Sequence, residues 1–350
     1  MRRLPVFFVL DCSESMVGAN LKKMEGAVAA IVKSLRTDPQ ALETVFFSVI
    51  AFAGVARTIA PLVEIVSFYP PKLPLGGGTN LGSALDALMG EIDRSVIKTT
   101  AERKGDWRPI IYLVTDGRPT DNPSRAIERW NSHYAKKATL IAIGLGRSVD
   151  FTALRRLTEN VISFEDIKES DFKKFINWVT ASVVVQSKSV GDGTDFQGLR
   201  ILDKSVMKII MEPPSTIADE TVVTLIGRCQ KTSRPYIIKY EQAMQDVVMK
   251  DFKVQVSRYE IAGCYPLEED YFEWSDPRTV DLKVNTSELF GAPGCPHCGA
   301  HTAFAVCGCG KLLCLNDAAS VVCPWCQKTV SFSSLGPDDE GGFEVRRGRG

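Results

Sequence analysis

The stretch Val6-Phe7-Phe8-Val9-Leu10-Asp11-Cys12-Ser13-Glu14-Ser15 is an apolar run that ends in one carboxylate and two hydroxyls at alternate positions. An uninterrupted run of Val, Phe and Leu is typical of a strand covered on both faces, as in a parallel sheet flanked by helices. Ligands of such sheets bind at the carboxyl ends of the strands. The sequence therefore predicts that Asp11, Ser13 and Ser15 lie at a ligand-binding edge.

Two later segments have the same character. Gly76-Gly77-Gly78-Thr79-Asn80-Leu81 combines a glycine loop, a hydroxyl and the start of a helical pattern. Ile110-Ile111-Tyr112-Leu113-Val114-Thr115-Asp116 is a second apolar run that ends in a carboxylate. Such oxygen ligands suit Mg²⁺ or Ca²⁺, although Asp-x-Ser-x-Ser taken alone is more typical of a turn that caps a helix.

Together the three segments resemble the metal-ion-dependent adhesion site of von Willebrand factor A domains, over residues 4–186. The resemblance implies that the ion is Mg²⁺, Mn²⁺ or Ca²⁺. The implied ligands are Asp11, Ser13, Ser15, Thr79 and Asp116. Two carboxylates and three hydroxyls leave the shell of the ion one protein ligand short, so we expect an Asp or Glu of a partner protein to complete it.

Strand and helix patterns alternate through this region, which predicts an α/β fold with a doubly wound, mostly parallel, Rossmann-like sheet. The expected strands are 4–10, 44–52, short segments within 56–68 that Pro61 splits at a sheet edge, 110–115, 139–144 and 161–164; the expected helices are 19–35, 80–97, one around Ile127 and Trp130, 151–157 and a closing helix 171–185.

The remaining chain changes character. Residues 187–198 have few apolar side chains and are expected to be a linker. Alternating segments in 199–290 predict a small antiparallel β domain. A cysteine-rich module is expected at 291–333, and the Gly- and charge-rich tail 334–350 is expected to be disordered.

Seven of the ten cysteines lie between Cys295 and Cys326. They are Cys295, Cys298, Cys307, Cys309, Cys314, Cys323 and Cys326. The two outer pairs are Cys-x2-Cys knuckles, each of which turns two thiolates toward one tetrahedral ion, so we expect one or two structural zinc ions. Two four-coordinate ions would require an eighth ligand, for which His297, His301 and Asp317 are candidates. Cys12, Cys229 and Cys264 are expected to be small core residues.

This C-terminal region resembles the metal-binding domain of TerY-like proteins, which are von Willebrand A proteins of bacterial tellurite-resistance clusters. The resemblance lies in the cysteine tail together with Leu225–Thr232, Tyr271–Asp276 and Cys307-Gly308-Cys309-Gly310-Lys311. It implies a cytoplasmic protein of a stress-response system whose partners include a protein kinase and a PP2C-type phosphatase.

Composition narrows the function further. The 42 Lys and Arg residues balance 42 Asp and Glu residues, so no overall field favours nucleic acid or a membrane surface, and no apolar run approaches the ~20 residues that span a bilayer. We expect a non-enzymatic protein-binding module, because Ser13 stands where a dehalogenase-type phosphatase has its second acid. The alternatives are a ubiquitin-ligase-like zinc module, a nucleic-acid-binding protein and a metal-dependent hydrolase.

Overall fold

The computed structural model describes residues 2–146, 149–164, 176–177, 179–184, 187, 221–249, 252–278, 282–316, 320–332 and 342–348. The contacts divide the chain into two compact units, each described here by itself. The first unit comprises Met1–Cys12, Ala19–Pro74 and Thr79–Ile217, and the second comprises Ser13–Gly18, Leu75–Gly78 and Ala218–Gly350. The expected linker lies outside the described residues except for Ser187, which is helical, and the described parts of the expected closing helix are helical.

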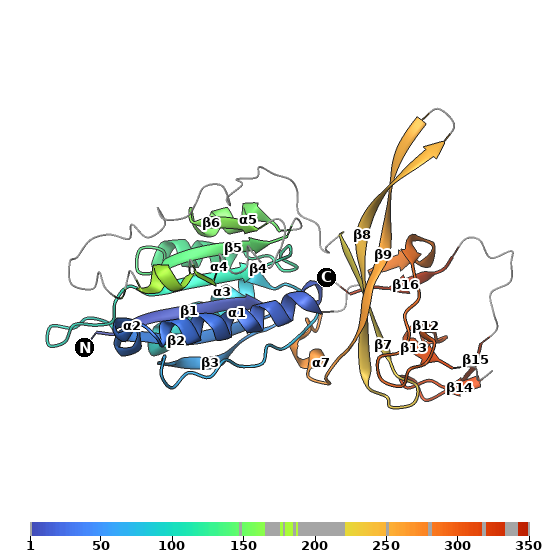
Figure 1. Cartoon of the computed structure of the whole chain (residues 1–350), viewed down its shortest axis with the longest axis horizontal. Coiled ribbons are helices and arrows are strands. Elements are labelled where there is room, and N and C mark those ends of the chain that lie inside the picture. The colour runs from blue at the N-terminus through green and yellow to red at the C-terminus, as the bar shows by residue number, and fades with distance from the viewer. Residues whose placement is uncertain are drawn as a thin grey trace. The chain divides into compact units, whose positions relative to one another are not determined.

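The first unit is built on a six-stranded sheet of order β3-β2-β1-β4-β5-β6, as Figure 1 shows. Its strands are β1 (Leu4–Asp11), β2 (Val45–Phe52), β3 (Ala56–Glu64), β4 (Ile110–Thr115), β5 (Thr139–Leu145) and β6 (Val161–Phe164). All neighbouring pairs are parallel except β2 and β3. The predicted α/β fold with a mostly parallel sheet is therefore confirmed.

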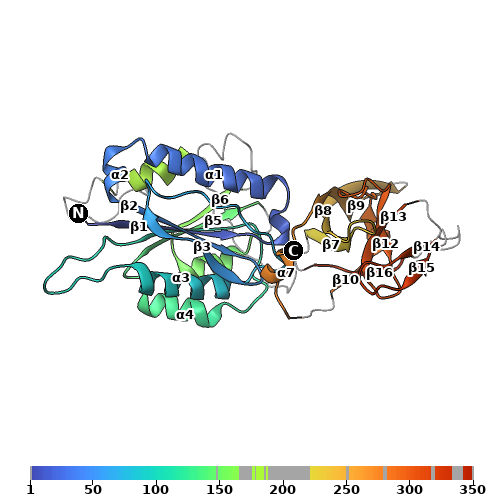
Figure 2. The same cartoon turned by 90° about the horizontal axis from the view of Figure 1, so that it is seen from below.

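Helices cover both faces of this sheet (Figure 2). They are α1 (Ala19–Leu35), α2 (Pro39–Thr44), α3 (Leu81–Ser95), α4 (Ser124–His133) and α5 (Phe151–Leu157). On one face, Phe7 and Val9 of β1 pack with Leu85 and Leu88 of α3, and on the other face Phe8 stacks on Phe47 at 4.9 Å between ring centroids. Every residue of β1 is buried, and each large apolar side chain taken from water contributes about 1.5–3 kcal/mol.

The edge of this sheet differs from the expectation in one respect. Pro61 does not split a strand, because β3 is continuous from Ala56 to Glu64. Pro61 falls in an irregularity between the pairs Phe47–Val63 and Val49–Ala60. A missing backbone N–H is tolerated at such an edge position, so the proline marks the edge, as expected, without ending the strand.

The second unit contains a six-stranded sheet of order β11-β9-β8-β7-β13-β12. Its strands are β7 (Val222–Arg228), β8 (Pro235–Met249), β9 (Phe252–Pro266), β11 (Leu289–Phe290), β12 (Thr302–Val306) and β13 (Leu312–Leu315). Smaller elements are η1 (Glu14–Met16), α7 (Tyr271–Trp274), η3 (Thr286–Glu288), the pair β10 (Lys283–Asn285) with β16 (Glu344–Arg346), and the pair β14 (Ser320–Val322) with β15 (Thr329–Ser331).

Two expectations about this region are wrong. We expected a β domain that ends at residue 290 and a separate cysteine module that starts at 291. The structure has one sheet across this boundary, because β13 of the cysteine region pairs with β7. The tail is not disordered throughout, because β16 pairs with β10 and Val345 is buried in the core beside Val284. Burial of Val345 gives this part of the tail an apolar anchor that its charged composition conceals. Within the described residues, no helix combines the length and apolar character needed to cross a membrane.

Candidate metal sites

Three of the five predicted oxygen ligands belong to the first unit, where strand ends gather them. Asp11 is the last residue of β1 and Asp116 directly follows β4, the parallel neighbour of β1. Both carboxylates are buried. Thr115 Oγ1 donates a hydrogen bond of 2.5 Å to Asp11 Oδ2, which ties the ends of the two strands together.

Thr79 reaches the same edge through its own loop. The amide of Asn80 donates to the carbonyl of Ala53, just past β2, at 2.8 Å. Thr79 and Thr120 are joined twice: Thr79 N donates to Thr120 Oγ1 at 2.8 Å, and Thr120 N donates to Thr79 O at 2.9 Å. The structure therefore brings Thr79 to the loops that follow β2 and β4.

Sequence reasoning missed the residues that support this edge. Besides Thr115 and Thr120, Asp121 accepts from the amide of Gly82 at 2.9 Å in the first turn of α3. Such a contact satisfies an otherwise unpaired N–H at a helix start. The run Pro119-Thr120-Asp121-Asn122-Pro123 has the composition of a turn, and its polar residues directly after a strand end were a usable signal.

The other two predicted ligands belong to the second unit. Ser13 and Ser15 are buried, and their Oγ atoms lie 2.9 Å apart. Ser13 also forms a backbone bridge with Gly76 of the glycine loop. Gly78 in that loop has φ of +98°, a conformation that side chains disfavour, so the loop requires glycine immediately before Thr79.

The donor set fits a hard divalent cation. It consists of two carboxylates and three hydroxyls, and all five residues are buried. Burying two carboxylates is costly unless hydrogen bonds or a cation compensate, and oxygen-only ligation is the preference of Mg²⁺ and Ca²⁺. The residues present therefore match the ion that the fold family implies.

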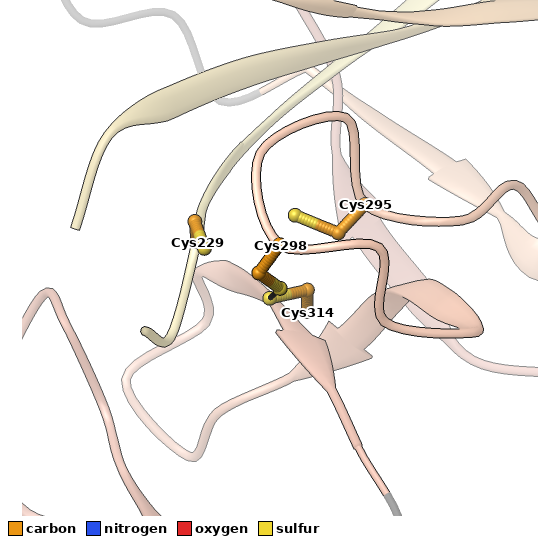
Figure 3. Close-up of side chains that lie close together, drawn as sticks. All are labelled: Cys229, Cys295, Cys298 and Cys314. Atoms are coloured by element: carbon orange, nitrogen blue, oxygen red, sulfur yellow. Dashed lines mark hydrogen bonds between the residues drawn. The ribbon is translucent and has the colours of Figure 1, made fainter. Parts of the chain in front are cut away.

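Eight cysteines of the second unit form two groups of four. The first group is Cys229, Cys295, Cys298 and Cys314, whose sulfur atoms all lie within 4.8 Å of one another (Figure 3). The second group is Cys307, Cys309, Cys323 and Cys326, with the same limit. Each set of four thiolates matches the tetrahedral coordination of structural zinc, which leaves no open position.

Cys229 corrects the prediction for the eighth ligand. It is buried in the core, as expected, but it also follows β7 and joins the knuckle Cys295–Cys298, because β7 lies beside β13, which carries Cys314. His297 directs Nε2 to the carbonyl of Pro235 at 2.7 Å and belongs to neither group. His301 is exposed and outside both groups, and Asp317 lies outside the described residues. An odd count of seven clustered thiols was the signal that a distant cysteine completes the set.

Hydrogen bonds and burial tune the thiols in opposite directions. Burial raises the pKa of Cys307 to about 12. At Cys229 burial also raises the pKa, but hydrogen bonds from Thr232 and from the Lys231 backbone outweigh it and bring the pKa down to about 7. The backbone amide of Lys328 lowers the pKa of Cys326 to about 7. Each group thus contains one thiol that ionises near neutral pH, a property that favours metal capture.

The two groups interleave along the chain. Cys295 and Cys298 belong to the first, Cys307 and Cys309 to the second, Cys314 again to the first, and the last knuckle to the second. This order is that of a cross-brace in which one member of the third pair is missing and Cys229 replaces it. Because ligands alternate, each group constrains the loop that carries the other.

Family models match both parts of the chain. The von Willebrand factor type A domain matches residues 6–177, and the TerY-C metal binding domain matches residues 219–350. The chain is a TerY-like von Willebrand factor A protein. The predicted family is thus confirmed, and the TerY-C match begins ahead of Cys229, in agreement with its place in the first cysteine group.

Curated relatives of this TerY-like protein match about half of the chain. Inter-alpha-trypsin inhibitor heavy chain H2 of Mus musculus is 29% identical over 201 residues, which is 51% of this chain and 20% of that protein. Matrilin-1 of Mus musculus is 27% identical over 162 residues, 45% of this chain and 31% of that protein. The chain spans between a fifth and a third of these relatives' lengths.

Two solved structures are similar to parts of this chain. Proximal thread matrix protein 1 from the mussel byssus is 19% identical, with a TM-score of 0.39, and the match covers 52% of this chain and 48% of that one. A von Willebrand factor type A structure from Catenulispora acidiphila is 15% identical with a TM-score of 0.39, covering 81% of this chain and 61% of that one.

Proposed function

We propose that this TerY-like protein is a non-enzymatic, metal-dependent protein-binding module. In this proposal Asp11, Ser13, Ser15, Thr79 and Asp116 hold a Mg²⁺-type ion, with Mn²⁺ or Ca²⁺ as substitutes. The observation that carries the proposal is the buried Asp11 carboxylate at the end of β1, held by Thr115 in a domain of the von Willebrand A family.

The chemistry of the donor set supports recognition of an acidic partner. A bound divalent cation supplies a positive centre for an anionic ligand. Only Asp11 and Asp116 bring negative charge to this donor set, and the three hydroxyls are neutral and leave the shell one protein ligand short. A partner's Asp or Glu carboxylate can therefore coordinate the ion directly, in a charge-assisted contact. Selectivity then depends on a partner that presents a carboxylate on a protruding loop.

The cysteine groups have a separate, structural role in this proposal. Each holds one Zn²⁺ with four thiolates, and a closed site of this kind supports the fold rather than a reaction. Trp325, in the last knuckle, donates from Nε1 to the carbonyl of Leu312 at 2.7 Å, which fixes the knuckle on β13. The zinc ions thus stabilise the sheet of the second unit.

The TerY-C match also supports a choice of partners. We propose a cytoplasmic scaffold or switch in a tellurite-resistance or stress-response system, with a protein kinase and a PP2C-type phosphatase among its partners. These assignments follow from the family resemblance, and each partner is directly testable.

The test measures binding of the purified kinase and phosphatase of such a gene cluster to the full chain by surface plasmon resonance. Binding is expected with Mg²⁺, and it is expected to disappear with EDTA and in Asp11→Ala. Asp86→Ala is the matched control, because Asp86 is an exposed acid of the same domain that pairs with Arg129. Binding that survives both EDTA and Asp11→Ala contradicts the proposal.

A further inference from the structure

We infer that Lys239 and Tyr271 of the TerY-C domain are positioning residues for the loop that carries Ser13 and Ser15. The inference rests on the proposed function and adds the contacts within the second unit that hold two of its five proposed ligands. Its starting point is that Ser13–Gly18 and Leu75–Gly78 group by their contacts with Ala218–Gly350. Segments that supply two ligands and lead into a third are thus packed as part of the second unit.

Lys239 makes the first contact. It lies on β8 and is 5% exposed, which is unusual for a lysine because burial of an ammonium requires polar partners. Its Nζ donates to the carbonyl of Ser15 at 2.8 Å and pairs with Glu241 Oε1 at 2.9 Å. The buried ammonium thereby fixes the backbone of a residue whose hydroxyl is a proposed ligand.

Tyr271 makes the second contact, between the two serines. Its hydroxyl donates to Glu14, which is 1% exposed. The Tyr271 ring packs with Val17, Ile237 and Leu267 in an apolar cluster. Burial and the neighbouring Glu14 carboxylate raise the pKa of Tyr271 well above its usual value, so the phenol stays protonated and remains a donor.

The run after Tyr271 holds the glycine loop. Gly77 N donates to Ser275 Oγ at 2.8 Å, and Asp276 N donates to the carbonyl of Gly77 at 2.8 Å. A Cβ at Gly76 would lie 2.6 Å from the Trp274 backbone, so only glycine fits there. Because Ser13 bridges to Gly76, one segment of the TerY-C domain holds both loops.

The same segment is attached to a cysteine knuckle. Phe272 meets Trp325 edge to face at 6.2 Å between centroids. The Arg228 guanidinium lies 5.2 Å from the Phe272 ring centre and 4.9 Å from that of Trp325, and it pairs with Glu269 at 2.9 Å. The knuckle Cys323–Cys326 is therefore linked through α7 to the Ser13–Ser15 loop, and its loading with zinc is expected to raise affinity for Mg²⁺.

Lys239 contacts a proposed ligand, Ser15, and Tyr271 contacts Glu14, which lies between two proposed ligands. Loss of supporting contacts at metal sites typically lowers affinity by roughly 10- to 100-fold. The test titrates Mg²⁺, and Mn²⁺ in parallel, into the zinc-loaded full chain by isothermal calorimetry. Tyr271→Phe and Lys239→Met are expected to weaken binding by about tenfold or more. Hydrogen exchange at 13–18 is expected to become faster in both variants, which reports the loop directly.

Tyr240→Phe is the matched control. Tyr240 is also buried in the TerY-C sheet and donates a hydrogen bond to the carbonyl of Gly291 at 2.9 Å. It packs in the core with Tyr236 and Ile238, whereas Val17 of the loop packs in a different cluster. Its Mg²⁺ affinity is expected to equal that of the wild type. Zinc content and thermal melting show whether each variant is folded, and Tyr271→Phe, which removes one oxygen, keeps the test valid should Lys239→Met not fold.

The outcomes separate this inference from the proposed function. If Asp11→Ala abolishes Mg²⁺ binding while Tyr271→Phe binds within about twofold of the wild type, far less than a supporting contact predicts, the positioning role is wrong and the proposed function stands. A wild-type chain that binds neither Mg²⁺ nor Mn²⁺ overturns both. A selective loss in Tyr271→Phe and Lys239→Met supports both.

Discussion

In the first unit the oxygen donors follow strands that are buried without them, whereas in the second unit the sulfur donors are themselves core residues. Phe7, Val9 and Leu113 pack in an apolar layer, and Asp11 and Asp116 lie at the ends of the strands that carry these side chains. Cys295 and Cys314 belong to the core around β7 and β8, and Cys307 and Cys323 to a small second core. For the ions of the proposed function, the comparison predicts a ligand of a finished fold in the first case and a part of the fold in the second.

Removal of zinc is the strongest test of this difference. Structural zinc contributes about 10–16 kcal/mol in comparable small sites, so chelation is expected to unfold the sheet of the second unit. Hydrogen exchange followed by mass spectrometry should then show loss of protection in β7 and β13, while β1 and β4 stay protected. A second unit that keeps its protection after complete chelation contradicts the comparison.

Cys229→Ser is the next largest change. It removes one of four thiolates from the first group, and the metal content is expected to fall from about two zinc ions per chain to about one, because a closed structural site needs all four ligands. Cys264→Ser is the control, since Cys264 belongs to neither group of described residues. Inductively coupled plasma mass spectrometry measures the zinc content of both purified variants. Equal zinc content in the two variants would show that Cys229 is not a ligand.

Leu113→Ala tests the first unit's reliance on apolar packing. Leu113 is fully buried in β4, and such truncations cost about 2–5 kcal/mol through lost transfer energy and a cavity. Denaturant unfolding of the first unit should show this loss equally with and without zinc chelator. Val66→Ala, at a position 54% exposed, serves as the comparison and should stay within about 0.5 kcal/mol of the wild type.

His297→Ala sharpens the assignment of sulfur ligands. The substitution removes the hydrogen bond to Pro235, which is worth about 0.5–1.5 kcal/mol. The zinc content is expected to be unchanged, and the melting temperature should fall only slightly. Loss of an equivalent of zinc would instead make His297 a ligand.

Asp11→Asn is expected to have the smallest effect on the fold itself. The amide oxygen still accepts from Thr115 and the shape is kept, so unfolding free energy without added metal should change by at most about 1 kcal/mol. The stabilisation that Mg²⁺ gives the wild type should disappear. Asp86→Asn should retain it, and calorimetric melting with and without Mg²⁺ measures both.

Most strands and helices of the first unit could be predicted from the sequence, because their apolar residues have a strong periodicity. The bounds of α1, α5 and β6 match the expected ranges, and the carboxylates lie at strand ends as expected. The contacts to the Ser13–Ser15 loop could not be predicted, because Lys239 lies in an alternating segment and has the pattern of a solvent-facing residue. Its flanking run Tyr236-Ile237-Ile238 and Tyr240 was the available hint of burial.

The cysteine region shows a different limit. Local spacing identified both knuckles but could not assign Cys229, whose role depends on β13 pairing with β7 far from it in sequence. The short strand Glu344–Arg346 was hidden for the same reason: its pairing with β10 is a tertiary contact that composition does not report. Sequence pattern specifies elements well and their distant neighbours poorly.

The interleaved cysteines also set an order of assembly. Cys307 to Cys326 enclose a short segment, while Cys229 is separated from Cys295 by the whole β8–β9 hairpin. Loop closure costs more entropy as the enclosed segment lengthens, so closing the local group costs an unfolded chain less entropy than closing the group that contains Cys229. The group that contains Cys229 also needs β7 beside β13, so we expect it to close after the local group during refolding.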